Sequence, residues 1–118
     1  MKKILIVDDE KYARFLYMEI LGKNYEFTEV EDGIEAIEEL ESDTYDLALV
    51  DLNLPFIRGE EVIKQVIGKL KKTKIVIISA LKQEELIKEL TELGIVGLIT
   101  KPINDIKELK ESVKKWCE

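Results

Sequence analysis

Short runs rich in apolar residues alternate along this chain with stretches whose apolar residues repeat at helical spacing. The short runs lie at 4–7, 27–30, 47–50, 75–78 and 96–99. Runs of this length bounded by polar residues are typical of buried strands. The helical stripes between and after them comprise Ala13, Leu16, Tyr17, Ile20 and Leu21; Ile34, Ile37 and Leu40; Val62, Ile63, Val66, Ile67 and Leu70; Leu86, Ile87, Leu90 and Leu93; and Ile106, Leu109, Val113 and Trp116. The pattern predicts strand and helix in strict alternation.

Five strand–helix repeats predict an α/β fold, because right-handed crossovers leave few other ways to pack them. We expect one domain over residues 1–118, with a central five-stranded parallel sheet in the order 2-1-3-4-5 and helices on both faces. This is the flavodoxin-like (βα)5 arrangement. Gly22 and Gly94 fall where the first and fourth helices should end.

Composition excludes several classes of function. The chain has 18 basic and 25 acidic residues, a formal net charge of −7, no histidine and one cysteine, Cys117. Histidine-based catalysis and the usual zinc sites are thereby excluded, and direct binding to nucleic acid is disfavoured. The absence of a long apolar run, together with the early carboxylates in MKKILIVDD, predicts a cytoplasmic protein without membrane association. The basic cluster of Lys69, Lys71, Lys72 and Lys74 is interpreted as a solvated helix end.

Polar residues end four of the predicted strands, at the edge where ligands bind in such sheets. Asp8 and Asp9 follow the first strand, Asp51 the third, Ser79 the fourth and Lys101 the fifth. Three crowded carboxylates repel one another unless a hard cation such as Mg²⁺ lies between them. Each residue alone has an ordinary explanation, as a helix cap, a loop acid or a surface lysine. Their coincidence at one edge favours a magnesium site with Asp51 as an oxygen nucleophile.

The chain resembles the receiver domain of two-component response regulators over nearly its whole length. The motifs that carry the resemblance are ILIVDDE at 4–10, DGIEAI at 32–37, LALVDLNLPFIRG at 47–59, VIISA at 76–80 and LITKP at 98–102. The resemblance implies that Asp51 accepts a phosphoryl group from a histidine kinase or phosphotransfer protein. It also implies that Ser79 and Lys101 hold the phosphoryl oxygens, and that the Lys101-Pro102 peptide is cis.

The same resemblance implies a set of Mg²⁺ ligands. Asp9 would bind directly, Asp8 through water, Asp51 through its carboxylate and Asn53 through its main-chain carbonyl. The domain would then act as a switch that changes binding to a downstream protein, and it would support its own phosphorylation and slow dephosphorylation without being an enzyme. A stand-alone receiver is expected, because the last predicted helix is followed by the end of the sequence at Glu118.

Three alternatives remain open. A pseudo-receiver would keep the fold as a binding module that does not use phosphorylation. A phosphatase of the haloacid dehalogenase type would need DxD at the nucleophile, whereas this chain has Asp51-Leu52-Asn53. A nucleotide or flavin binder is disfavoured, because the first loop, DDEKYAR, lacks glycine and repels phosphate.

Three departures and additions suggest further properties. Asn53 and Leu81 occupy positions that govern dephosphorylation in the family, and the apolar Leu81 predicts a slow rate. Leu98 stands where the family usually has Tyr or Phe, which puts the usual ring switch in doubt and points to the loop after Ser79 and the fourth helix. Phe15 and Met18 lie outside the core stripe of the first helix and predict a docking patch for the kinase.

Overall fold

The computed structural model describes residues 1–80 and 83–118, and in them strands and helices alternate as expected. The strands are β1 (Lys2–Val7), β2 (Tyr25–Val30), β3 (Leu47–Asp51), β4 (Lys74–Ser79) and β5 (Gly97–Thr100). The helices are α1 (Lys11–Leu21), α2 (Gly33–Ser42), α3 (Gly59–Val66), the short 3₁₀ helix η1 (Ile67–Lys69), α4 (Glu84–Leu93) and α5 (Ile106–Trp116). The five predicted strands and five predicted helices are confirmed.

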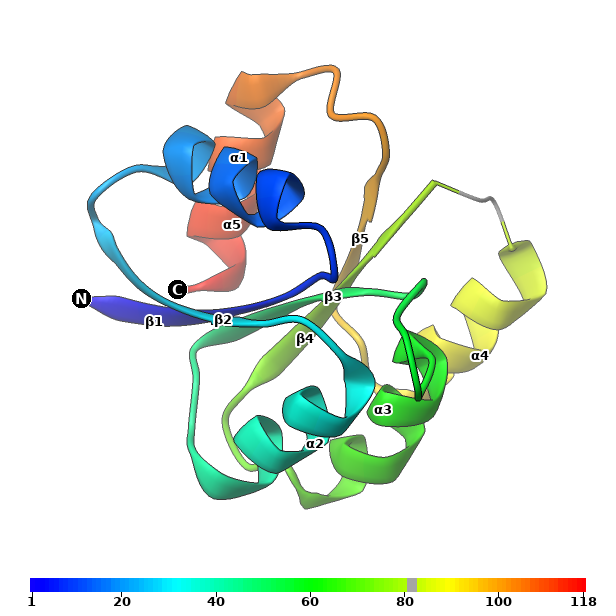
Figure 1. Cartoon of the computed structure of the whole chain (residues 1–118). Coiled ribbons are helices and arrows are strands. Elements are labelled where there is room, and N and C mark those ends of the chain that lie inside the picture. Colours follow the sequence, from blue (N-terminus) through cyan, green and yellow to red (C-terminus); the bar gives the residue numbers. More distant parts are fainter. Residues whose placement is uncertain (81–82) are drawn as a thin grey trace.

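The sheet is parallel in the order β2-β1-β3-β4-β5, so the predicted fold class is also confirmed. Helices α1 and α5 cover one face, and α2, α3 and α4 cover the other (Figure 1). Because every strand runs in the same direction, the carboxyl ends of β1, β3, β4 and β5 meet at one edge. That edge holds Asp8, Asp51, Ser79 and Lys101.

Two apolar clusters fill the spaces above and below the sheet. On β1, Leu5 and Val7 pack with α2, α3 and α4, whereas Ile4 and Ile6 pack with α1 and α5. Successive side chains of a strand point to opposite faces, which explains why the strand sequence reads as a continuous apolar run. The central strands are thus packed on both faces, and this packing fixes the positions of their carboxyl ends.

Two positions on α1 differ from the sequence prediction. Leu16, assigned to the core stripe, is 37 % exposed, whereas Met18, assigned to the outer face, is half-buried and packs against the α1–α5 cluster. The stripe that faces the sheet keeps the predicted Tyr17 and Leu21 and adds Arg14, spaced i, i+3 and i+7, and the predicted Ala13 and Ile20 also pack against this cluster. The helix is therefore rotated from the predicted orientation, with an arginine taking a core-facing position.

Both predicted glycine stops are present, because Gly22 and Gly94 follow α1 and α4 with φ of 85° and 125°. The interpretation of the basic cluster is correct only in part. Lys69 ends η1, but Lys74 lies on β4 and its Nζ donates to the main-chain oxygens of Trp116 (2.8 Å) and Glu118 (3.2 Å). Among the described residues, no helix has the length and apolar character needed to cross a membrane.

Candidate functional site

Asp8 lies immediately after β1 and is fully buried. Its main-chain N–H donates to the Val30 carbonyl (3.1 Å), and its Oδ1 accepts from the Glu10 main-chain N–H (2.9 Å). Asp9, the next residue, is exposed. The adjacent aspartates therefore have different environments, one fixed inside the edge and one open to solvent.

Asp51 is the last residue of β3 and is 5 % exposed. Its Oδ1 accepts from the Asn53 main-chain N–H (2.8 Å), and its Oδ2 lies 2.5 Å from Lys101 Nζ. Gly59 allows the chain to pass close by, because a Cβ there would lie 2.4 Å from the Asp51 carbonyl oxygen. The carboxylate is thus oriented from both oxygens at the centre of the edge.

Lys101 connects the two buried carboxylates. It follows β5, and its Nζ lies 2.5 Å from Asp51 Oδ2 and 3.4 Å from Asp8 Oδ2. Its main-chain N–H donates to the Ser79 carbonyl (3.0 Å), and its peptide bond to Pro102 is cis, as expected. One ammonium group therefore serves two carboxylates.

The protonation of this cluster reflects its crowding. Burial raises the pKa of Asp8 to about 6, and repulsion from Asp51 adds to the increase, although the Glu10 N–H and Lys101 act in the opposite direction. Burial alone would lower the pKa of Lys101, but its contacts with Asp51 and Asp8 outweigh burial and raise it. A single lysine does not fully compensate the two acids, so the edge retains an affinity for positive charge.

Ser79 completes the edge from β4 and is buried. Ser79 pairs with Thr100 in the ladder, and Ile78, just before it, pairs with Asp51. This register places Ser79 one residue beyond Asp51 along the strand direction. The structure therefore brings together Asp8, Asp51, Ser79 and Lys101 from four strands.

The oxygen ligands are of the kind that Mg²⁺ prefers. One carboxylate oxygen from each of Asp8, Asp9 and Glu10 lies within 4.8 Å of the others. Glu10 was not among the expected ligands, whereas Asp51, which was, is paired with Lys101. The main-chain N–H of Asn53 bonds to Asp51, which puts its peptide beside the predicted phosphoacceptor. A hard cation fits this set of donors.

Sequence reasoning missed Arg14, the buried cation behind the acidic pair. It is 8 % exposed, and its Nη1 donates to the Asp8 carbonyl oxygen (2.6 Å). The signal in the sequence was the spacing of Arg14 from Tyr17 and Leu21, which places it on the same face as two core residues.

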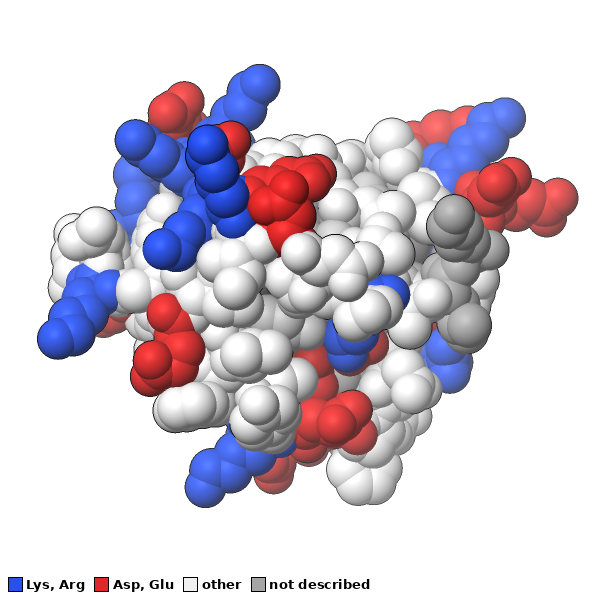
Figure 2. Space-filling view, turned by 90° about the horizontal axis from the view of Figure 1, so that it is seen from above, with Lys and Arg blue, Asp and Glu red and all other residues white. Residues whose placement is uncertain are grey.

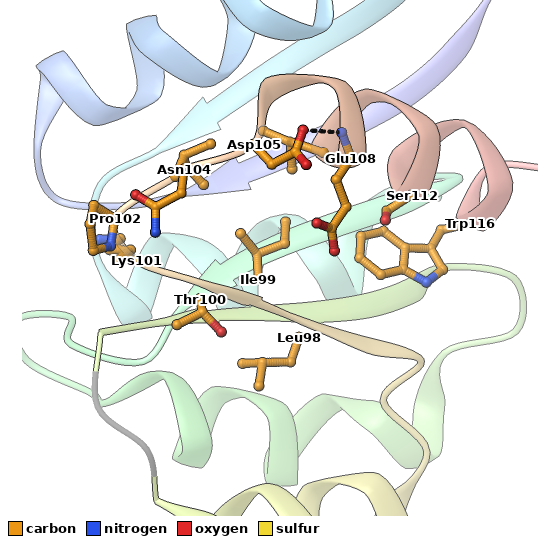
Figure 3. A pocket seen from close by; sticks show the side chains of 12 residues that line it. Leu98, Ile99, Thr100, Lys101, Pro102, Asn104, Asp105, Glu108, Ser112 and Trp116 are labelled. Atoms are coloured by element: carbon orange, nitrogen blue, oxygen red, sulfur yellow. Dashed lines mark hydrogen bonds between the residues drawn. The ribbon is translucent and has the colours of Figure 1, made fainter.

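A cavity of about 260 Å³ lies beside the acidic edge, between β5 and α5 (Figure 3). It shares Lys101 with the site. A Cβ on Gly97 would lie 2.4 Å from the Trp116 ring, so the glycine lets the indole lie against β5.

Leu98 and Thr100 lie on the other side of the β5 ribbon from Trp116, and Leu98 is 39 % exposed. The position where the family has an aromatic ring therefore holds a partly exposed leucine. Leu81, the other position noted for dephosphorylation, lies outside the described residues.

Exposed apolar side chains gather on α1 beside the acidic pair. Tyr12, Phe15 and Leu16 are 74 %, 52 % and 37 % exposed, and Phe15 and Leu16 lie three and four residues after Tyr12. The prediction that Phe15 and Met18 both lie outside the core is confirmed for Phe15 and wrong for Met18, which packs against the α1–α5 cluster. On the described part of the face that contains α1 and α5, uncharged surface fills much of the middle, with lysine, arginine and acidic side chains mixed around it (Figure 2). We call Tyr12, Phe15 and Leu16 the α1 patch.

Comparisons with known proteins identify the family to which this fold and site belong. The model of the response regulator receiver domain matches residues 4–114, so the chain belongs to this family. It is 32 % identical over 116 residues to sporulation initiation phosphotransferase F of Bacillus subtilis, covering 98 % of this chain and 93 % of that protein. It is 33 % identical over 102 residues to the chemotaxis protein CheY of Halobacterium salinarum, covering 86 % and 85 %.

Solved structures show the same likeness. The response regulator TrrA of Thermotoga maritima, in complex with Mg²⁺ and BeF, superposes with a TM-score of 0.84 at 37 % identity, covering 98 % of this chain and 99 % of that one. A CheY-like receiver domain from Methanospirillum hungatei gives a TM-score of 0.90 at 26 % identity, covering 99 % and 94 %.

Proposed function

We propose that this receiver domain accepts a phosphoryl group on Asp51 from a phosphohistidine of a histidine kinase or phosphotransfer protein. The observation that carries the proposal is the orientation of the Asp51 carboxylate, with one oxygen bonded to the Asn53 N–H and the other to Lys101. A carboxylate held in this way at the carboxyl edge of the sheet is suited to act as a positioned nucleophile.

In the proposed transfer, a carboxylate oxygen of Asp51 forms a bond to phosphorus as the bond from phosphorus to the histidine nitrogen breaks. The electron pair of the broken bond stays on the imidazole. Lys101 and the Ser79 hydroxyl bind phosphoryl oxygens, so the charge that Asp51 gains is met by one cation and one hydrogen-bond donor. Ser79 would draw the segment that follows it toward the site, and this movement would change binding to a downstream protein.

Mg²⁺ completes the proposed site. Asp9 would bind it directly, Asp8 through water, and Asp51 and the Asn53 carbonyl from β3 and its following loop; Glu10 is a further candidate because its carboxylate lies near those of Asp8 and Asp9. When bound, the metal supplies positive charge for the phosphoryl oxygens.

The first test is labelling with a small acyl phosphate and Mg²⁺, followed by mass spectrometry of the intact protein and its peptides. We expect one phosphoryl adduct on Asp51 and none in Asp51→Asn, because a side-chain amide is not a nucleophile near neutral pH. No adduct on the wild-type protein would favour a pseudo-receiver, and steady hydrolysis without an adduct would favour a phosphatase. Undiminished labelling of Asp51→Asn would show that another residue is the acceptor.

We also propose that the α1 patch docks the protein that donates the phosphoryl group. It lies on the helix that begins two residues after Asp9, so a partner seated on it can reach Asp51. Phe15→Ala should slow transfer from the cognate kinase roughly tenfold, as expected for loss of an aromatic interface anchor. Labelling by acyl phosphate should be unchanged. Leu93→Ala, which truncates a similarly exposed residue at the far end of α4, is the matched control. Equal slowing with both donors would contradict docking.

A further inference from the structure

Arg14 donates two hydrogen bonds from its guanidinium group, to two different parts of the fold. Nη1 donates to the Asp8 carbonyl oxygen at 2.6 Å, and Nε donates to Glu29 Oε1 at 2.9 Å. The side chain of Arg58, the other arginine of the chain, is 52 % exposed and pairs with Glu60. The planar fork of an arginine suits such a double contact, because its donors are fixed relative to one another.

These bonds close a ring around the end of β1. The Asp8 N–H donates to the Val30 carbonyl of β2, and Arg14 of α1 donates to the Asp8 carbonyl. Arg14 also donates to Glu29, the neighbour of Val30. The peptide groups on both sides of Asp8 are therefore tied to β2. The Asp8 side chain is fixed separately, through the Glu10 N–H.

The contact of Arg14 is with the backbone and not with the carboxylate. The charged groups with the largest influence on the Asp8 carboxyl are Asp51 and Lys101. Arg14 instead fixes the peptide that joins Asp8 to Asp9, and so sets the direction in which both side chains leave the strand. A buried carbonyl that lost this donor would turn toward water or another donor.

We propose that Arg14 is a positioning residue that holds the Asp8–Asp9 peptide so that the two carboxylates converge on one cation. The proposal rests on the proposed function, because it assumes that the acidic pair binds Mg²⁺. Charge and position predict opposite effects of removing Arg14. A buried cation near the site repels Mg²⁺, so loss of its charge alone would tighten binding. Loss of positioning would weaken binding.

The test measures Mg²⁺ binding to the unphosphorylated protein, by titration calorimetry and by the NMR chemical-shift changes of the Asp8, Asp9 and Glu10 amides. For Arg14→Ala we expect a dissociation constant at least 10-fold higher than that of the wild-type protein, the usual effect of removing a residue that orients a metal ligand. Lys69→Ala removes the same charge from an exposed ion pair in η1, at the opposite end of the sheet, and should leave the constant unchanged. Equal or tighter binding by Arg14→Ala would overturn the proposal.

Arg14→Lys covers the case in which the alanine variant does not fold. It keeps the charge and most of the aliphatic stem but lacks the fork, so repulsion of Mg²⁺ is the same as in the wild-type protein. A severalfold weaker constant is expected, and wild-type affinity would overturn the proposal. Urea unfolding of each variant separates positioning from stability, because a purely structural role would lower stability without changing Mg²⁺ affinity of the folded protein. If the wild-type protein itself does not bind Mg²⁺, the proposed function fails instead.

Discussion

The two ends of the sheet contain the same types of charged residue in opposite situations. At the carboxyl end, Asp8 and Asp51 are buried around Lys101. At the amino end, Asp43 and Asp46 pair with lysines that are partly or largely exposed. The Lys3 main-chain N–H lowers the pKa of Asp46, and a side-chain bond from Lys3 lowers that of Asp43, whereas burial raises the pKa of Asp8.

The difference shows which charges support the fold and which belong to the site. An acid whose pKa is lowered by folding stabilises the folded state when ionised, and an acid whose pKa is raised destabilises it. Ionised Asp43 and Asp46 at the amino end therefore contribute stability, whereas ionised Asp8 at the carboxyl end reduces it, and the raised pKa of Lys101 offsets part of that cost. A buried carboxylate whose ionisation opposes folding, in a cluster built from four strands, is typical of a functional site.

The largest expected effect is a gain in stability on Asp8→Asn without metal. Because folding raises the Asp8 pKa from 3.8 to about 6, ionising this residue costs the folded state about 3 kcal/mol at most. The asparagine oxygen can still accept from Glu10. At pH 8 we expect the variant to unfold at a higher urea concentration, with a free energy of unfolding roughly 2 kcal/mol larger than that of the wild-type protein.

The pH dependence follows from the same shift. Between about pH 4 and 6 the unfolded chain releases the Asp8 proton and the folded chain retains it, so wild-type stability falls as pH rises through this range. The advantage of Asp8→Asn should therefore vanish below about pH 4. An advantage that is the same at pH 4 and pH 8 would show that it does not come from the carboxylate charge.

Much of this comparison was visible in the sequence, and some was not. The apolar runs ending in Asp8, Asp51, Ser79 and Lys101 predicted both the sheet and its charged edge, because such runs indicate buried strands and the helices between them imply parallel crossovers. The rotation of α1 was missed, because the apolar Leu16 fits the helical core stripe and the charged Arg14 does not. Only tertiary contacts with Asp8 and Glu29 make the arginine the inward residue.

The amino end should respond in the opposite direction. Asp46→Ala removes the acceptor for the Lys3 main-chain N–H (2.8 Å) and the partner of Lys72 (3.0 Å). Leaving a part-buried donor without a partner costs about 1 to 2 kcal/mol. Because folding lowers the Asp46 pKa, the charge contribution is present above its unfolded pKa and is lost as pH falls. Urea unfolding should show a loss that shrinks toward pH 3. Asp46→Asn keeps an acceptor and should lose less; an equal loss would assign the effect to charge alone.

The smallest effect concerns the backbone. At the helix ends before β2 and β5, positive φ occurs at Gly22 and Gly94, where it costs little. At the carboxyl end it occurs at Phe56 (φ 68°), which is the one non-glycine residue with positive φ in residues 1–80 and 83–118. A side chain in this region costs about 1 kcal/mol or more, and Phe56, at 80 % exposure, has little packing to offset the cost.

Phe56→Asn should therefore stabilise the protein by roughly 0.5 to 1 kcal/mol, because asparagine tolerates left-handed backbone better than phenylalanine does. Phe56→Ala is the matched control, since it removes the ring but keeps a Cβ without that tolerance. Urea unfolding at neutral pH measures both. A gain in the asparagine variant alone would show that the loop after Asp51 holds backbone strain that the glycine-ended turns avoid. An equal gain in the alanine variant would instead assign the cost to the exposed ring, and the two ends of the sheet would then differ in charge but not in backbone strain.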